Sequence, residues 1–135
     1  MTAGLTAHDP PTVPRPEGGY VHAVEVGPGQ RLLFISGQIP VGLDGEVPPD
    51  AEAQCRLIWS HIVACLEHAG MAVTDLVKVT TFLGDRDVAA ANAVVRREVL
   101  GEHRPALTVV VAEIYDSAWL LEIEAIAAGG EPSEA

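Results

Sequence analysis

Two glutamates interrupt an otherwise apolar segment near the C-terminal end of the chain, residues 120–127. In a β-strand alternate side chains point to opposite faces, so Glu122 and Glu124 would share one face while the other face stays apolar. A carboxyl group among apolar atoms keeps its proton more readily and can exchange it near neutral pH. We predict that Glu122 is a catalytic general acid or base. Glu124 is expected instead to pair with a basic residue or to reach solvent.

Metal and nucleophile chemistry has no comparable support in the sequence. The histidines and cysteines show no metal-ligand spacing, since His61 and His68 lie far apart, as do Cys55 and Cys65. The two cysteines would be about 15 Å apart on one helix, too far for a disulfide. No glycine-rich phosphate loop and no serine–histidine–aspartate pattern is visible. We therefore expect two reduced thiols, no metal and no cofactor.

Composition narrows the class of protein and of partner. The chain has 135 residues, of which 48% are hydrophobic, and a formal net charge of −11. This length suits one domain with its own core. The negative charge argues against nucleic acid and anionic membranes as partners. No targeting segment and no run long enough to span a bilayer is visible, so we expect a cytoplasmic protein that acts on a small molecule.

Hydrophobic periodicity and turn residues predict elements in the order β-β-α-β-α-β-β. The predicted strands cover residues 20–26, 31–36, 76–83, 107–114 and 119–127, and the predicted helices cover residues 50–69 and 87–100. The first two strands should form a hairpin across a turn that contains glycine and proline. We further expect a flexible, proline-rich leader over residues 1–18, one domain over residues 19–128 and a disordered tail over residues 129–135.

This order predicts a two-layer α+β domain, with two helices on one face of a mixed sheet. Several predicted strands are apolar on both faces, including residues 108–111 and 119–121, which indicates that both faces of the sheet are buried. Two helices can cover only one face. We therefore expect a second copy of the chain to cover the other face.

Three segments of the chain together resemble the Rid family, also called YjgF/YER057c/UK114 and endoribonuclease L-PSP. They are Phe34-Ile35-Ser36-Gly37-Gln38-Ile39-Pro40, His103-Arg104-Pro105-Ala106-Leu107-Thr108 and Leu121-Glu122-Ile123-Glu124-Ala125-Ile126-Ala127. The similarity runs from about residue 18 to residue 127. It implies a chorismate-mutase-like fold, a homotrimer with pockets between subunits, and hydrolysis of reactive imines and enamines.

The resemblance also implies roles for individual residues. Glu122 matches the family glutamate that positions or activates the attacking water. Tyr20, in Gly18-Gly19-Tyr20, matches a tyrosine that lines the pocket, although an interface or core role would suit a tyrosine equally well. The positions implied to bind substrate are Ser36, Gly37, Asn92, Leu107 and Thr108.

One position departs from the family pattern. The family has Pro-Ala-Arg, whose arginine grips the substrate carboxylate, whereas this chain has Pro105-Ala106-Leu107. Leucine offers no hydrogen bond, so we expect 2-imino and 2-enamino acids to bind poorly. Arg104 could substitute, but its odd offset from Leu107 would point it to the other face of the sheet. Arg96 and Arg97 are expected on a solvated helix face.

The interpretation that we favour is a small acid–base enzyme acting on an imine, enamine or amino-carbonyl compound without an anchoring carboxylate. It would catalyse hydrolytic deamination, or the reverse dehydrative condensation or cyclisation, in a dedicated pathway. One alternative is a non-catalytic trimer with a binding, regulatory or structural role. Another is a standard 2-imino acid deaminase in which Arg104 replaces the family arginine. Glu122 favours an enzyme, because a non-catalytic protein has no need of an acid in an apolar strand.

Overall fold

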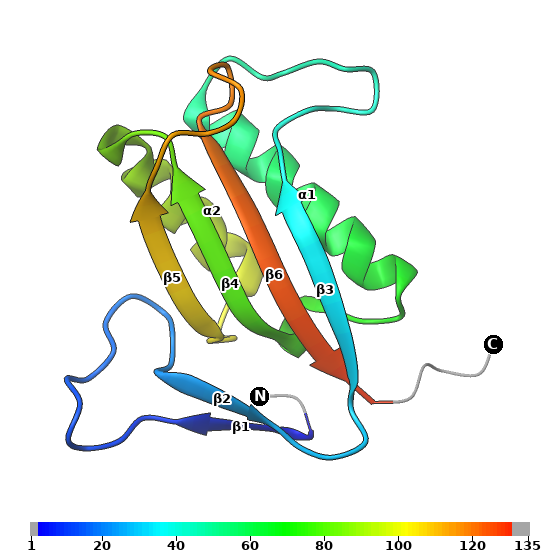
Figure 1. Ribbon diagram of the computed structural model, residues 1–135, viewed down its shortest axis with the longest axis vertical. Coiled ribbons are helices and arrows are strands. Elements are labelled where there is room, and N and C mark those ends of the chain that lie inside the picture. Colours follow the sequence, from blue (N-terminus) through cyan, green and yellow to red (C-terminus); the bar gives the residue numbers. More distant parts are fainter. Residues whose placement is uncertain (1–2, 131–135) are drawn as a thin grey trace.

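The computed structural model describes residues 3–130, which form two sheets and two long helices (Figure 1). The strands are β1 (Leu5–His8), β2 (Ala23–Val26), β3 (Arg31–Gln38), β4 (Leu76–Leu83), β5 (Ala106–Val111) and β6 (Leu121–Gly129). The helices are α1 (Ala51–His68) and α2 (Ala89–Leu100), with single 3₁₀ turns η1 (Val73–Asp75) and η2 (Arg86–Val88).

The main sheet has the strand order β3-β6-β4-β5. β5 runs parallel to β4, and β6 runs antiparallel to both β3 and β4, so the sheet is mixed. In Figure 1 both helices lie behind this sheet, and its front face carries no helix. The predicted two-layer α+β architecture with two helices on one face is confirmed.

Helix α1 follows the periodicity of the sequence closely. The Asp50 side chain caps it by accepting a 2.8 Å hydrogen bond from the Ala53 backbone N–H. Its residues Ile58, Ile62 and Leu66, at four-residue spacing, are fully buried between the helices and the sheet. Gly70, with φ of +73°, takes the left-handed conformation that ends such a helix.

The predicted N-terminal hairpin is wrong. β2 pairs with β1, a strand inside the segment predicted to be a flexible leader, and β3 pairs with β6. The physical reason is a second small core, in which Leu5 packs with Val77 and Ala128 of the main sheet. A strand of four residues is too short for its alternation to stand out in sequence. The hairpin of β1 and β2 therefore docks at the lower end of the main sheet (Figure 1).

Two further sequence predictions bear on the ends of the elements. The second helix was predicted from residue 87, but α2 begins at Ala89 after the turn η2, which the Asp85 side chain caps by accepting the Asp87 backbone N–H at 2.8 Å. Gly129 still belongs to β6, and the rest of the predicted tail, apart from residue 130, lies outside the described residues. Within residues 3–130, no helix has the length and apolar character needed to cross a membrane.

Candidate functional site

Glu122 lies near the start of β6, beside an irregularity in the neighbouring strand β3. The register between the two strands shifts between Ile35 and Gln38, which is where Ser36 and Gly37 stand. The Glu122 carboxylate lies directly against the Gly37 backbone, and a β-carbon at position 37 would overlap it. The missing side chain of glycine is therefore what lets this carboxylate approach the main chain.

The carboxylate belongs to the face of the sheet that no helix covers, which we call the open face. On β4, Phe82 pairs in register with Glu122, and Thr80 pairs with Glu124. Glu124 was expected either to pair with a basic residue or to reach solvent. It is exposed and forms no ion pair among the described residues, so it reaches solvent. Together with Ser36, it lines a hollow of about 240 Å³ on this face.

Thr108 adds a hydroxyl group to the same face. The Lys78 ammonium group donates a 2.6 Å hydrogen bond to Thr108 Oγ1, from β4 to β5. Lys78 also lines the hollow that Ser36 and Glu124 share. The open face thus carries Ser36, Gly37, Thr108 and Glu122 of the predicted site residues.

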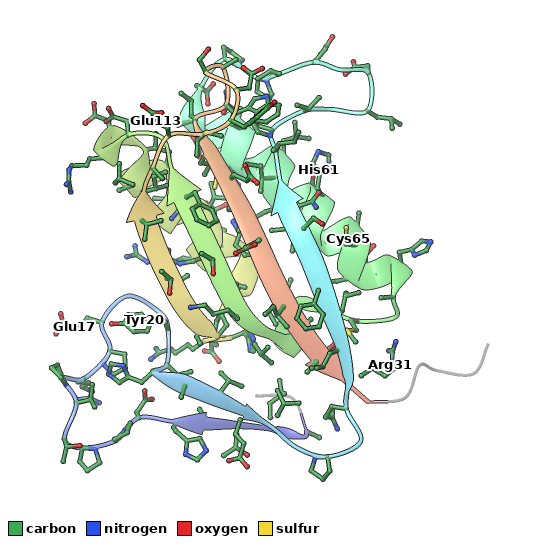
Figure 2. All side chains as sticks on the ribbon, viewed as in Figure 1. Glu17, Tyr20, Arg31, His61, Cys65 and Glu113 are labelled. Carbon is green, nitrogen blue, oxygen red and sulfur yellow. The ribbon has the colours of Figure 1, made fainter. Side chains whose placement is uncertain are left out.

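Tyr20 lies elsewhere, on the long loop between β1 and β2. Figure 2 shows it, with Glu17 beside it, where this loop approaches the lower end of β5. The Val21 backbone N–H donates a 3.2 Å hydrogen bond to the Pro105 carbonyl oxygen, which fixes the end of the loop against the strand. Tyr20 and Arg104 are the chain neighbours of these two residues, and both line a hollow of about 430 Å³.

Within one chain, Tyr20 and Glu122 cannot meet. Val21 bridges to Ala106, which stands level with Lys78 on β4 and therefore with Ile126 on β6. Ile126 is four positions along β6 from Glu122, which corresponds to about 13 Å. The two side chains are also two strands apart across the sheet. A site that uses both needs two copies of the chain.

Leu107 and Asn92 do not lie with Glu122 either. Leu107 pairs in register with the buried Val79 and packs against the core beneath the helices, so it faces away from the open face. Asn92 is buried in α2, where its amide oxygen is 3.9 Å from the Cys55 sulfur and accepts its S–H. In the single chain both residues therefore belong to the helix side of the sheet.

Arg96 corrects the expectation of a solvated helix face. It is only 7% exposed, and its guanidinium donates a 3.1 Å hydrogen bond to the Gly18 carbonyl oxygen, two residues before Tyr20. Burial lowers the pKa of this arginine, and the neighbouring Arg97 lowers it further. The sequence did contain a signal, since Arg96 is one helical turn from Asn92 and so shares its buried face.

Arg15 was also missed, because it lies in the segment that we expected to be mobile. It lines the hollow beside Tyr20 and Arg104. Both cysteines are free thiols, and the described residues contain no group of three or more His, Cys, Asp or Glu side chains placed to hold a metal ion. The polar groups that the structure gathers are therefore the open face with Glu122 and the hollow beside Tyr20.

Almost the whole domain is similar in sequence to known proteins. The family model described as Endoribonuclease L-PSP matches residues 11–129. A RutC family protein of Pyrococcus horikoshii is 40% identical over 116 residues, which are 84% of this chain and 90% of that protein. The 2-iminobutanoate/2-iminopropanoate deaminase of Escherichia coli K12 is 39% identical, over 82% of this chain and 87% of the enzyme.

Solved structures show the same architecture. A Rid family protein of Yersinia pestis, YyfB, superposes with a TM-score of 0.80 at 26% identity, covering 92% of this chain and 98% of that one. The E. coli TdcF structure with bound serine has a TM-score of 0.68 at 33% identity, covering 90% of this chain and 97% of that one.

Proposed function

Because the chain belongs to the endoribonuclease L-PSP family, which includes the Rid proteins, we propose that it hydrolyses reactive imines or enamines. One observation supports this most, namely the Glu122 carboxylate held against Gly37 on the open face. A carboxylate there can take a proton from water while the water attacks a C=N carbon, and can then return it to the departing amine. The net reaction converts imine and water into carbonyl compound and ammonia or an amine.

We propose that the site is completed between copies of the chain, in a homotrimer. The separation of Tyr20 from Glu122 within one chain supports a shared site. The open face supports an interface, since Phe34 on β3 is 71% exposed and Leu32 is 55% exposed. Large apolar side chains gathered on one uncovered face are typical of a surface that packs against a partner. The trimeric state itself follows from the resemblance to the family.

The charge of the substrate depends on what replaces the family arginine. Our expectation of a substrate without a carboxylate rested on Leu107, which replaces the family arginine and offers no hydrogen bond to a carboxylate. In one chain Leu107 packs against the core on the helix side of the sheet, so a carboxylate would have to be bound by another residue. Arg104 lies beside Tyr20 instead, and the relative TdcF was solved with serine, a molecule that carries a carboxylate. We therefore favour a carboxylate-bearing substrate and keep the uncharged one as the alternative.

Two other activities fit less well. Dehydrative condensation would use the same proton transfers in reverse. The E. coli relative at 39% identity is named a deaminase, however, which favours hydrolysis. The family name also mentions a ribonuclease. A net charge of −11 disfavours a polyanionic substrate, because cationic groups supply most of the affinity for nucleic acid.

Substitution of Glu122 by Gln tests the proposed function. The amide cannot exchange the proton, so kcat/KM on 2-iminobutanoate and 2-iminopropanoate should fall by about 10²- to 10⁴-fold. The imines can be generated in place by an amino acid oxidase, with semicarbazide as the competitor that traps them. Size-exclusion chromatography with light scattering should show the same oligomer as the unchanged protein.

Glu124→Gln is the matched control, since Glu124 lies two residues along the same strand on the same face. It removes the same charge and should leave the rate nearly unchanged. Equal losses in both variants, or an active Glu122→Gln variant, would refute the acid–base role of Glu122. If the protein without any substitution hydrolyses no imine, the alternative of a non-catalytic binding protein is favoured.

A further inference from the structure

The hollow beside Tyr20 differs from the rest of the surface in its charge. The chain has eight lysines and arginines against 19 acidic residues, yet two of those arginines, Arg15 and Arg104, line this one hollow. Among the described residues, neither guanidinium forms an ion pair or a side-chain hydrogen bond. Both side chains are exposed, and two unpaired guanidinium groups that line one hollow can together bind an anionic group from outside the chain.

The single acid in the hollow is already engaged. An Asp9 carboxylate oxygen accepts a 2.7 Å hydrogen bond from the His22 backbone N–H. The residues that line the hollow therefore carry two positive groups against one negative group, and Glu17 lies beside Tyr20 but outside the lining. The Tyr20 hydroxyl forms no hydrogen bond among the described residues and is available to a ligand.

The walls of the hollow are fixed rather than loose. The proline-rich segment that carries Arg15 is tied to His22, whose Nε2 forms a 2.6 Å hydrogen bond with the Pro14 carbonyl oxygen. On the opposite side Arg104 precedes the buried Pro105, and proline restricts the backbone of both residues. A cavity of about 430 Å³ with such walls has room for a small metabolite.

We propose that this hollow binds the carboxylate group of a small molecule, with Arg104 and Arg15 as hydrogen-bond donors and the Tyr20 hydroxyl as a third polar contact. Planar guanidinium groups match the two oxygens of a carboxylate. The identity of the occupant rests on the proposed function, since it would be the substrate or the 2-oxo acid product. The hollow then supplies the anchor that Leu107 cannot provide.

Binding of pyruvate, a stable 2-oxo acid, tests the proposal without any turnover. Isothermal titration at constant ionic strength should show saturable binding of pyruvate to the unchanged protein. Pyruvamide, its neutral analogue, should bind about 10-fold to 100-fold more weakly, and Arg104→Gln and Arg15→Gln should each weaken pyruvate binding by a similar factor. Arg86→Gln is the matched control, because Arg86 is exposed and lies outside the hollow.

Three results would overturn the proposal. The first is equal binding of pyruvate and pyruvamide, and the second is unchanged pyruvate affinity in both arginine variants. The third is phosphate that binds as tightly as pyruvate and loses affinity in the same arginine variants. The last would show general attraction of anions. The two proposals can fail separately. Loss of activity in Glu122→Gln with unchanged pyruvate binding in both arginine variants refutes the anchor alone, whereas an active Glu122→Gln variant refutes the proposed reaction alone.

Discussion

Gly37 and Glu122 form a contact that depends on the absence of one side chain. The φ angle of Gly37 lies outside the left-handed region, so the backbone at position 37 would also accept alanine. The β-carbon of alanine would overlap the Glu122 carboxylate, which is the flexible end of its side chain and can move aside. We expect Gly37→Ala to keep its fold and to lose about 10- to 100-fold in kcat, since a misplaced catalytic group costs this much.

The rate and the melting temperature of Gly37→Ala should therefore respond differently. Gly130→Ala is the control, because a β-carbon at that position meets nothing within 4 Å. A fall in stability that matches the fall in kcat would show that Gly37 acts through packing. An unchanged kcat would show that the carboxylate position does not matter to the reaction.

Among individual residues, sequence reasoning named several side chains that the structure brings together, but it did not place all of them correctly in space. Glu122 and Gly37 were predicted to belong to one site, and the structure places them in contact. Leu107 was judged by its place in a motif, and a motif does not tell which face of an edge strand a residue takes in this chain. Arg15 could not be found, because its partner in the hollow, Arg104, is distant in sequence and the connecting loop has no periodicity.

Helix α1 and strands β4 and β6 were predictable because each buries a regular stripe of apolar side chains. The pairing of β2 was not predictable in the same way. A glycine–proline turn between two apolar stretches is typical of a hairpin, yet the tertiary contact of Leu5 with Val77 and Ala128 favours β1 as its partner. Local turn signals do not contain that long-range contact.

The contact between α1 and α2 includes a thiol whose protonation should affect stability. Burial of Cys55 raises its pKa from an ordinary value of 9.0 to about 12, although Arg56 and Arg96 partly oppose this effect. The folded protein thus keeps the proton that the unfolded chain releases above about pH 9. This contribution is complete below pH 9 and is lost as the pH rises towards 12.

Urea unfolding between pH 8 and pH 10.5 should show this dependence. The unfolding free energy of the unchanged protein should fall more steeply with pH than that of Cys55→Ala, by at most about 1.4 kcal/mol per pH unit. Cys65→Ala controls for loss of the other thiol, which is only partly buried. Equal slopes in the unchanged protein and in Cys55→Ala would show that Cys55 does not cause the dependence.

At the scale of the whole molecule, the uncovered face of the sheet and the distance between the two polar sites have one explanation. In the proposed oligomer, a second copy on the open face would bury Phe34 and could bring its own Tyr20 and Arg104 towards Glu122 of the first. The sequence predicted the need for a partner from strands that are apolar on both faces. The structure adds that one chain holds Tyr20 and Glu122 apart.

Mixed oligomers test this sharing directly. Glu122→Gln and Tyr20→Ala should each be poorly active alone. If each site takes Glu122 from one chain and Tyr20 from another, random mixing restores about a quarter of the sites. Refolding the two variants together at equal amounts should then recover about a quarter of the unchanged activity. Glu122→Gln mixed with Gly37→Ala is the control, because those residues touch within one chain and no intact site can form. Recovery in the control, or none in the test mixture, would contradict a site built from two chains.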